Sequence, residues 1–120
     1  MEESGYTVDF YITKQGKCPI DEFLDSLEKK VRAKTMKWIQ QLESEGPNLI
    51  RPYADILVDD IRELRVQFRS KQYRFLYFFY SKRVVMTHAF LKKTDEVPSV
   101  EVERAKRYRK DWIERCAHGG

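Results

Sequence analysis

The segment from Tyr73 to Tyr80 reads Tyr-Arg-Phe-Leu-Tyr-Phe-Phe-Tyr, and this nearly continuous aromatic run constrains the fold more than any other feature. A run this apolar and this short is typical of a strand that is buried on both faces. On one side of it in the chain, residues 63–69 alternate between apolar and polar types, which predicts a second strand. On the other side, residues 83–91 predict a third. Three consecutive strands of this kind favour an antiparallel arrangement.

The other segments predict helices and loops around these strands, within one domain over residues 1–120. Helical spacing of apolar residues is the signal for the helices, and Gly46-Pro47 ends the second of them. The predicted elements are a strand at 6–12, a helix that starts at Pro19, a helix over 31–42, a loop at 48–60 and a charged helix at 99–115. The predicted fold class is α+β, with two N-terminal helices packed on a small, twisted, mainly antiparallel sheet and with a C-terminal helix.

Two turns set the expected strand register, because side chains alternate between the faces of a sheet. The expected turn centres are Ser70-Lys71 and Ser81-Lys82. The expected opposite pairs are Gln67 with Arg74, Arg65 with Leu76, Arg74 with Ala89, Leu76 with Thr87, and Phe78 with Val85. The expected core face holds Leu64, Val66, Phe68, Tyr73, Phe75, Tyr77, Phe79, Val84, Met86, His88 and Phe90. The other face is expected to be cationic and open to a partner, with Arg65, Gln67, Arg69, Arg74, Leu76, Phe78, Val85, Thr87 and Ala89.

The positive charge of the chain is concentrated in this same region. Residues 62–93 contain nine basic residues and one acid, Glu63, so they carry +8, whereas the rest of the chain carries −4. The window also holds eight of the 16 aromatic residues. Basic charge interleaved with aromatic rings favours nucleic acid as a partner. Solubilising charge on the outer face of a strand-rich core explains the same composition equally well.

Several function classes find little support in the sequence. No apolar run approaches the ~20 residues of a membrane span, and the acidic N-terminus (residues 1–5) is unlike a secretory signal, so a cytoplasmic protein is expected. Cys18 and Cys116 lie far apart, which argues against a zinc site or a disulfide scaffold. The chain has no Gly-rich phosphate loop, and neither a metal nor a cofactor is expected. A Ser-His-Asp triad would need His88, because His118, the other histidine, lies in the C-terminal tail. The expected register turns His88 into the core.

Arginine and lysine side chains on one sheet face remain as the candidate chemistry. A guanidinium group binds phosphate in a bidentate manner and stays charged at any working pH. Arg65 and Arg74, on neighbouring strands, are therefore placed to hold one phosphodiester and to stabilise the charge of a phosphoryl-transfer transition state. The alternatives are that these arginines only bind a nucleic-acid backbone, or that they pair with acidic groups of a protein partner.

Taken together, several motifs of the chain resemble a known family. Glu63-Leu64-Arg65, Tyr73 to Phe78, and His88 to Thr94 with Pro98 are similar in order and spacing to the phage-derived HigB-like branch of the RelE/ParE toxin superfamily. The likeness extends to Pro19–Leu24 and Gly46-Pro47, so it covers nearly the whole chain. The resemblance implies a microbial-ribonuclease-like fold and the toxin of a type II toxin–antitoxin pair. It further implies a metal-independent endoribonuclease that cleaves messenger RNA, often at the ribosome, and a helix-turn-helix antitoxin of the HigA-like type as partner.

The resemblance also implies roles for individual residues. Arg74 is expected to contact the scissile phosphate, with Arg65 as a second cation or an orienting group. Lys92 or Lys93 is expected to supply further charge or the proton for the leaving group. Glu63 either takes part or pairs with a neighbouring arginine. RNA binding is assigned to Arg69, Lys71, Gln67 and Phe78.

Two other functions stay open at the level of the sequence. Relatives of the ParE type share the fold and act on DNA gyrase without cutting RNA. A plain RNA-binding or protein-binding module that modulates a host is the third possibility. The cationic face is also the expected contact of the antitoxin, with the C-terminal helix held or shifted when the antitoxin docks.

Overall fold

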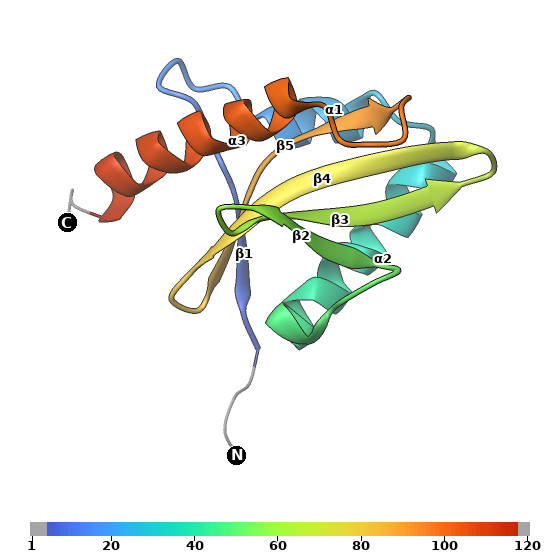
Figure 1. The fold of residues 1–120 in the computed structure, drawn as a ribbon, viewed down its shortest axis with the longest axis horizontal. Coiled ribbons are helices and arrows are strands. Elements are labelled where there is room, and N and C mark those ends of the chain that lie inside the picture. The colour runs from blue at the N-terminus through green and yellow to red at the C-terminus, as the bar shows by residue number, and fades with distance from the viewer. Residues whose placement is uncertain (1–4, 118–120) are drawn as a thin grey trace.

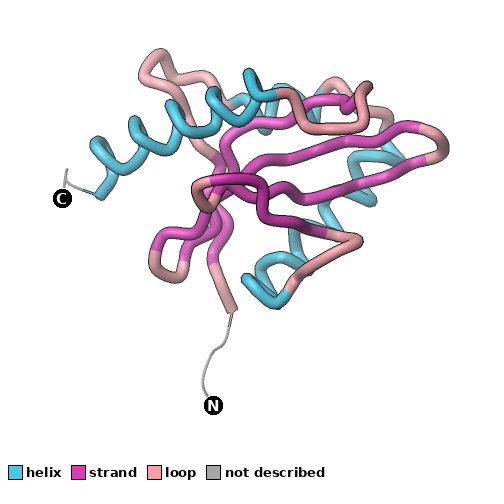
Figure 2. The backbone as a smooth tube through the Cα atoms, viewed as in Figure 1, coloured by secondary structure: helices cyan, strands magenta, loops and turns pink. Residues whose placement is uncertain are grey.

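One five-stranded mixed sheet, with strand order β1-β5-β4-β3-β2, organises the computed structural model, which describes residues 5–117. In Figure 2 the strands form a single curved layer with helices on both sides of it. The elements in chain order are β1 (Thr7–Phe10), α1 (Pro19–Asp25), α2 (Lys29–Glu45), the 3-10 turn η1 (Gly46–Asn48), β2 (Ala54–Val58), β3 (Ile61–Phe68), β4 (Lys71–Tyr80), β5 (Arg83–Lys92), α3 (Ser99–Trp112) and the π-helical turn η2 (Ile113–Ala117).

The predicted α+β class is confirmed, and the aromatic strand β4 lies at the centre of the sheet. The pairs β2–β3, β3–β4 and β4–β5 are antiparallel, and β1 runs parallel to β5. Strand β2 was not expected, because residues 48–60 had been predicted as a loop. Its residues pair with β3 through a tight turn in which Asp59 and Asp60 both have positive φ, 52° and 63°.

The β3–β4 register differs from the predicted one by two residues. The turn lies at Arg69–Ser70 rather than at Ser70-Lys71, and Arg69 takes a positive φ of 58° there. Arg65 consequently pairs with Arg74, and Gln67 pairs with Gln72. The prediction was wrong because a left-handed backbone at an arginine has no signal in the sequence. This register places two guanidinium groups side by side on one face.

The β4–β5 register is correct at the hairpin and shifts further along. Phe78 pairs with Val85 as predicted, but an irregularity after Leu76 leaves Thr87 as an extra residue in β5. Beyond this bulge Leu76 pairs with His88 and Arg74 pairs with Phe90. His88 therefore lies on the opposite face from the one predicted, although it is buried as expected.

Two hydrophobic clusters cover the two faces of the sheet. One cluster joins α1 and α2 to the face that carries Leu64, Val66 and Phe75. The second joins Ala105 and Trp112 of α3 to the face that carries Leu76 and Phe78. Figure 1 shows α3 crossing above the strands, with α2 at the β3 side of the sheet. The face that was expected to be open is thus closed over much of its area by α3, and Leu76, Phe78, Val85 and Thr87 are buried.

None of the helices in residues 5–117 combines the length and the apolar character needed to cross a membrane.

Candidate nucleic-acid interface

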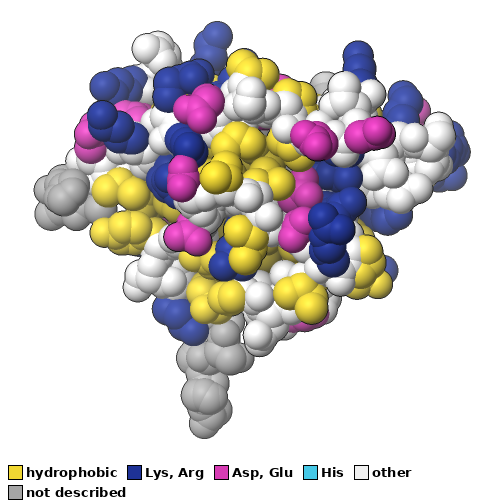
Figure 3. All heavy atoms as spheres, in the orientation of Figure 1, with side chains coloured by type: hydrophobic (Ala, Val, Ile, Leu, Met, Phe, Trp, Pro, Cys, Tyr) yellow, Lys and Arg dark blue, Asp and Glu magenta, His cyan; other side chains and the backbone are white. Residues whose placement is uncertain are grey.

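The end of the sheet beyond α3 carries the exposed part of the predicted cationic face. Arg65 and Gln67 of β3 share this face with Gln72 of β4 and Lys92 of β5, since these residues pair across the strands. The hairpin that joins β3 to β4 adds Arg69 and Lys71, both exposed. In Figure 3 Lys and Arg side chains gather on this right-hand part of the molecule, with an apolar patch at the centre. We call these six residues and Lys93 the cationic end of the sheet.

Arg74 lies beneath this surface, in a buried ion pair with Glu63. Arg74 Nε is 3.1 Å from Glu63 Oε1, and the residues are only 2% and 4% exposed. Arg74 also donates hydrogen bonds to the carbonyl of Tyr73 (3.1 Å) and to Oε1 of Gln72 (3.3 Å). The Nε–Oε1 contact is close but not aligned as a hydrogen bond, so these two atoms have no hydrogen-bond partner. Four polar or charged groups are thus packed together at the base of the cationic end.

In this structure Arg74 is not placed to contact a scissile phosphate, which was its expected role. A phosphate cannot reach a guanidinium group that is 2% exposed and already surrounded by a carboxylate and two acceptor oxygens. The alternative that Glu63 pairs with a neighbouring arginine is the one that the structure contains. Removal of a charge from water is tolerated only when it is paired, which explains why the two residues are buried together.

Arg65 is the arginine of this cluster that reaches solvent. Its side chain is 27% exposed, and its Nε lies 4.0 Å from Glu63 Oε2. Burial raises the pKa of Glu63 above its usual range, and the positive charges of Arg74 and Arg65 oppose this shift. Burial likewise lowers the pKa of Arg74, against the opposing effect of Glu63. One carboxylate therefore faces two arginines, and the outer one, Arg65, is the one that solvent reaches.

The lysines and the hairpin residues lie where a strand of nucleic acid can reach them. Lys92 is half-buried, and its Nζ donates to the carbonyl of Asp95 (2.8 Å), whereas Lys93 is exposed. The guanidinium carbon of Arg69 lies 5.1 Å from the ring centroid of Phe68. The amide of Gln67 donates to the carbonyl of Arg69 (3.5 Å). The roles assigned to these residues stay predictions.

Phe78, which was assigned to RNA binding, is 2% exposed and belongs to the core under α3. Its ring centroid lies 5.8 Å from that of Trp112, in an edge-to-face arrangement. The assignment treated this face of β4 as uncovered, whereas α3 packs over it. His88 is likewise held by α3, with its Nε2 at 2.9 Å from Glu101 Oε1. His118 lies outside the described residues.

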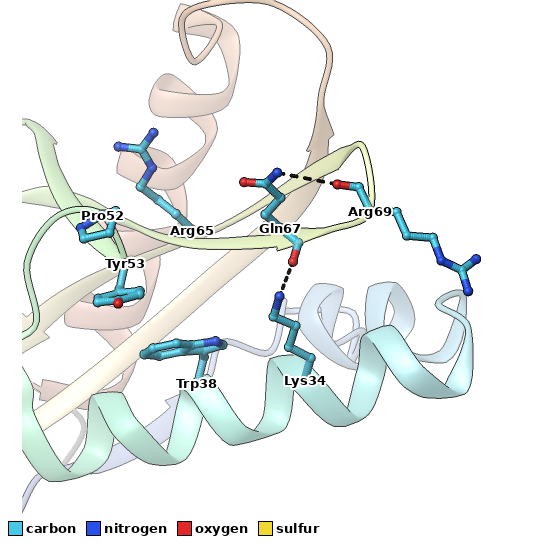
Figure 4. Close-up of a pocket in the computed structure, with 7 residues that line it drawn as sticks. All are labelled: Lys34, Trp38, Pro52, Tyr53, Arg65, Gln67 and Arg69. Carbon is cyan, nitrogen blue, oxygen red and sulfur yellow. Dashed lines mark hydrogen bonds between the residues drawn. The ribbon is translucent and has the colours of Figure 1, made fainter.

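An open groove of about 380 Å³ lies beside the cationic end, between α2 and the free edge of β3 at residues 65–68, where β3 extends past its pairing with β2. Figure 4 shows Lys34 and Trp38 rising from α2, with Tyr53 lying over Trp38 and Arg65 above them. Trp38 and Tyr53 are stacked, with ring centroids 4.5 Å apart and an interplanar angle of 20°. The lining residues are Lys34, Trp38, Pro52, Tyr53, Arg65, Gln67 and Arg69.

The contribution of Lys34, Trp38 and Tyr53 to this groove was not predicted from the sequence. Lys34 and Trp38 are four residues apart in α2, so the helical spacing signals that they share a face. Trp38 lies within the predicted helix over residues 31–42, and part of its surface packs against the core. Nothing in the sequence places Tyr53, which precedes the unexpected strand β2, on top of it.

Within residues 5–117 no group of three or more His, Cys, Asp or Glu side chains is arranged to hold a metal ion. Cys18 is half-buried and Cys116 is exposed, and both are free thiols.

Comparison with known families gives the broader context. A family model described as phage-derived protein Gp49-like (DUF891) matches residues 22–110, which is well over half of the chain. The match places the chain in the wide class of RelE/HigB-like toxins. Within that class, the chain belongs to the family of phage-derived Gp49-like proteins. No curated protein matches it. The narrower HigB-like branch that the sequence motifs suggested stays a prediction.

Proposed function

We propose that this protein is the toxin of a toxin–antitoxin pair, and that it binds messenger RNA at the cationic end of the sheet and cleaves it. The natural substrate in this proposal is messenger RNA bound to the ribosome. Membership of the Gp49-like family supports the toxin class. The observation that carries the RNA assignment is the arrangement of Arg65, Gln67, Arg69 and Lys71 with Lys92 and Lys93 at one end of the sheet. A polyanion is the ligand that such a surface attracts.

In the proposed reaction all atoms and protons are accounted for without a cofactor. The 2′-oxygen of a ribose attacks the adjacent phosphorus and passes its proton to a solvent water, and the bond from phosphorus to the 5′-oxygen breaks. The 5′-oxygen takes a proton, so the products are a 2′,3′-cyclic phosphate and a free 5′-hydroxyl. Arg65 is the cation that we assign to the phosphate, because it is the solvent-reaching guanidinium beside Glu63. Lys92 or Lys93 is assigned the proton of the leaving group.

Arg74 becomes a positioning residue in this proposal. Its ion pair with Glu63 fixes the carboxylate that also faces Arg65, at 4.0 Å from Arg65 Nε. The rotamer of a functional side chain is held by such supporting contacts. Arg74 therefore acts through Glu63 and Arg65, without touching the RNA.

A second candidate function is RNA binding without cleavage. The burial of Arg74 favours it, since the guanidinium expected to stabilise the transition state is withdrawn from solvent and neutralised by Glu63. A protein of this kind would hold or shield a message and arrest its use without cutting it. The two candidates share the same surface and differ only in the chemistry that follows binding.

Induced expression followed by primer extension on total RNA separates the candidates. Cleavage predicts new 5′ ends within coding regions soon after induction, together with loss of protein synthesis. The double variant Arg65→Ala, Lys92→Ala should not produce these new 5′ ends when it is induced. The variant Lys110→Ala is the matched surface control and should still produce them. Arrest with intact messages indicates the binding-only function, and arrest with DNA damage indicates action on DNA gyrase. Either result overturns the cleavage proposal.

A further inference from the structure

We infer that the stacked pair Trp38–Tyr53 is a base-binding platform, which takes up one unstacked base of a single-stranded RNA whose phosphates lie on the cationic end of the sheet. The inference rests on the proposed function and deepens it by adding a subsite on α2 and the loop before β2. The platform lies in the groove of about 380 Å³ between α2 and the edge of β3.

The geometry of the pair suits one further ring. Tyr53 is 44% exposed although its other face is covered by Trp38, with ring centroids 4.5 Å apart. Trp38 is half-buried and packs against the hydrophobic core, so it supports Tyr53 from below. The backbone on both sides of the ring is fixed, because Tyr53 N–H donates to the carbonyl of Ile50 (3.0 Å) and Arg65 N–H donates to the carbonyl of Tyr53 (2.8 Å). A rigid exposed aromatic face is what base stacking requires.

The charges around the platform match a nucleic acid. Lys34, Arg65 and Arg69 line the groove together with the two rings, and no acidic side chain of the described residues lines it. Arg65 belongs both to this groove and to the cationic end of the sheet, so a strand of RNA can place a base on Tyr53 and a neighbouring phosphate against Arg65. Figure 4 shows Arg65 directed away from α2, on the far side of β3 from Trp38.

A protein segment that adds a strand to the free edge of β3 fits the groove less well. Strand addition needs free backbone groups at the edge. Lys34 Nζ already donates to the carbonyl of Gln67, and the N–H of Arg65 is bonded to Tyr53. A lysine that covers an edge in this way is a common block against strand pairing. Stacking uses the ring face instead and leaves these bonds intact.

Fluorescence anisotropy with a labelled single-stranded RNA tests the platform directly. The probe is an oligouridylate of about ten nucleotides with 2′-O-methyl groups, which bind but cannot be cleaved through the 2′-oxygen. Tyr53→Ala should weaken binding about 5- to 150-fold, the range measured for loss of one base stack. Tyr53→Phe keeps the ring and should bind like the parent. Tyr80→Ala, which removes an exposed tyrosine outside the groove, is the matched control and should also bind like the parent.

A second measurement keeps the test valid if Tyr53→Ala does not fold. In the parent protein, a scan of abasic sites along the probe should find one position where loss of the base weakens binding as strongly as Tyr53→Ala does. In the folded variant, loss of that base should have no further effect, since the two changes remove one contact.

The remaining outcomes separate the inference from the proposed function. Equal RNA affinity of the parent and Tyr53→Ala overturns the platform and leaves the proposed function standing, provided that Arg65→Ala weakens binding. Absence of RNA binding by the parent overturns both. Equal RNA affinity combined with weaker binding of an extended acidic peptide of about ten residues by Tyr53→Ala assigns the groove to a protein partner and overturns the platform.

Discussion

Glu63 Oε1 lies 3.1 Å from Arg74 Nε in a diagonal contact between β3 and β4, and both side chains are almost completely buried. The contact depends on the strand register, in which Glu63 pairs with Leu76 and Arg65 pairs with Arg74. It makes the central arginine of the sheet a support for its neighbours. Of the two cross-strand arginines, Arg65 is partly exposed and is therefore the one available to a ligand.

Loss of Arg74 should destabilise the fold. Arg74→Ala leaves Glu63 as an unpaired buried carboxylate, and removal of one partner of a buried ion pair costs about 3–5 kcal/mol. The measurement is the free energy of unfolding in urea. A Glu63→Leu, Arg74→Met double variant should recover most of the loss, because neither charge then remains in the interior. If Arg74→Ala unfolds like the parent yet loses RNA cleavage, Arg74 is functional and its structural role is wrong.

Phe78 should contribute to stability and leave RNA binding unchanged. Its ring is buried against Trp112 of α3, and truncation of a buried phenylalanine to alanine costs about 3–5 kcal/mol. Chemical denaturation of Phe78→Ala measures this loss. Phe78→Leu fills most of the volume and is the variant for RNA titration. A drop in the RNA affinity of a fully folded Phe78→Leu would restore the original assignment of Phe78 to the interface.

Salt dependence of binding should count the phosphates that Arg65 and Arg69 contact. For single-stranded nucleic acid the slope of log K against log salt changes by about 0.7 for each phosphate neutralised. Arg65→Ala and Arg69→Ala should therefore each reduce the slope by about 0.7. Lys110→Ala, on the exposed side of α3, should leave it unchanged. Unaltered slopes in the first two variants would show that these arginines do not contact the backbone.

His88 should make the fold less stable in mild acid. Burial lowers the pKa of His88 below 6.5, and the hydrogen bond with Glu101 opposes this shift, while Arg104 and Arg107 add to it. The unfolded chain then binds the proton more tightly than the folded protein does. The contribution of neutral His88 to the free energy of unfolding is therefore fully present above pH 6.5 and is lost as the pH falls through the pKa of the folded state. The melting temperature of the parent should decrease between about pH 7 and pH 5.

The variant His88→Asn provides the comparison for this pH dependence. It cannot titrate in that range, so its melting temperature should change less with pH than that of the parent. A parent protein that becomes more stable on acidification would contradict the sign of the pKa shift. Equal slopes in the parent and the variant would show that another group causes the dependence.

The three-stranded part of the fold was predictable because its signal is local. Alternation in residues 63–68 and the aromatic run of β4 define strands, and the two-residue turn at Ser81-Lys82 gives the pairing of Phe78 with Val85. Strand β2 was not predictable in the same way. Pro52 lies two residues before this strand, and the segment is only partly apolar. It becomes a strand through its pairing with β3.

The candidate site was predictable in composition and not in geometry. The concentration of positive charge in residues 62–93 indicated the surface, and Arg65, Arg69 and Lys71 lie on it. The burial of Arg74 follows from a register shift of two residues, which brings Glu63 next to it. The left-handed backbone at Arg69 and the extra residue at Thr87 set that geometry, and neither has a local sequence signal.

The groove illustrates a second limit of sequence reasoning. Trp38 lies in α2 and Tyr53 precedes β2, so their stacking depends on how the helix packs on the sheet. A single tryptophan in an amphipathic helix indicates a core residue as readily as a binding residue. Only the tertiary structure shows that its partner ring is exposed.

The most direct test of the proposed function is the cleavage of a defined messenger RNA by the purified protein, free and bound to ribosomes, with analysis of the product ends. The parent should produce 2′,3′-cyclic phosphate and 5′-hydroxyl ends, a 2′-deoxy substitution at the cut position should block the reaction, and Arg65→Ala should slow it at least tenfold, as expected for removal of a cation that stabilises the transition state. Intact RNA with the parent protein, or equal cleavage by Arg65→Ala, would contradict the assignment of an RNA-cleaving site to the cationic end of the sheet.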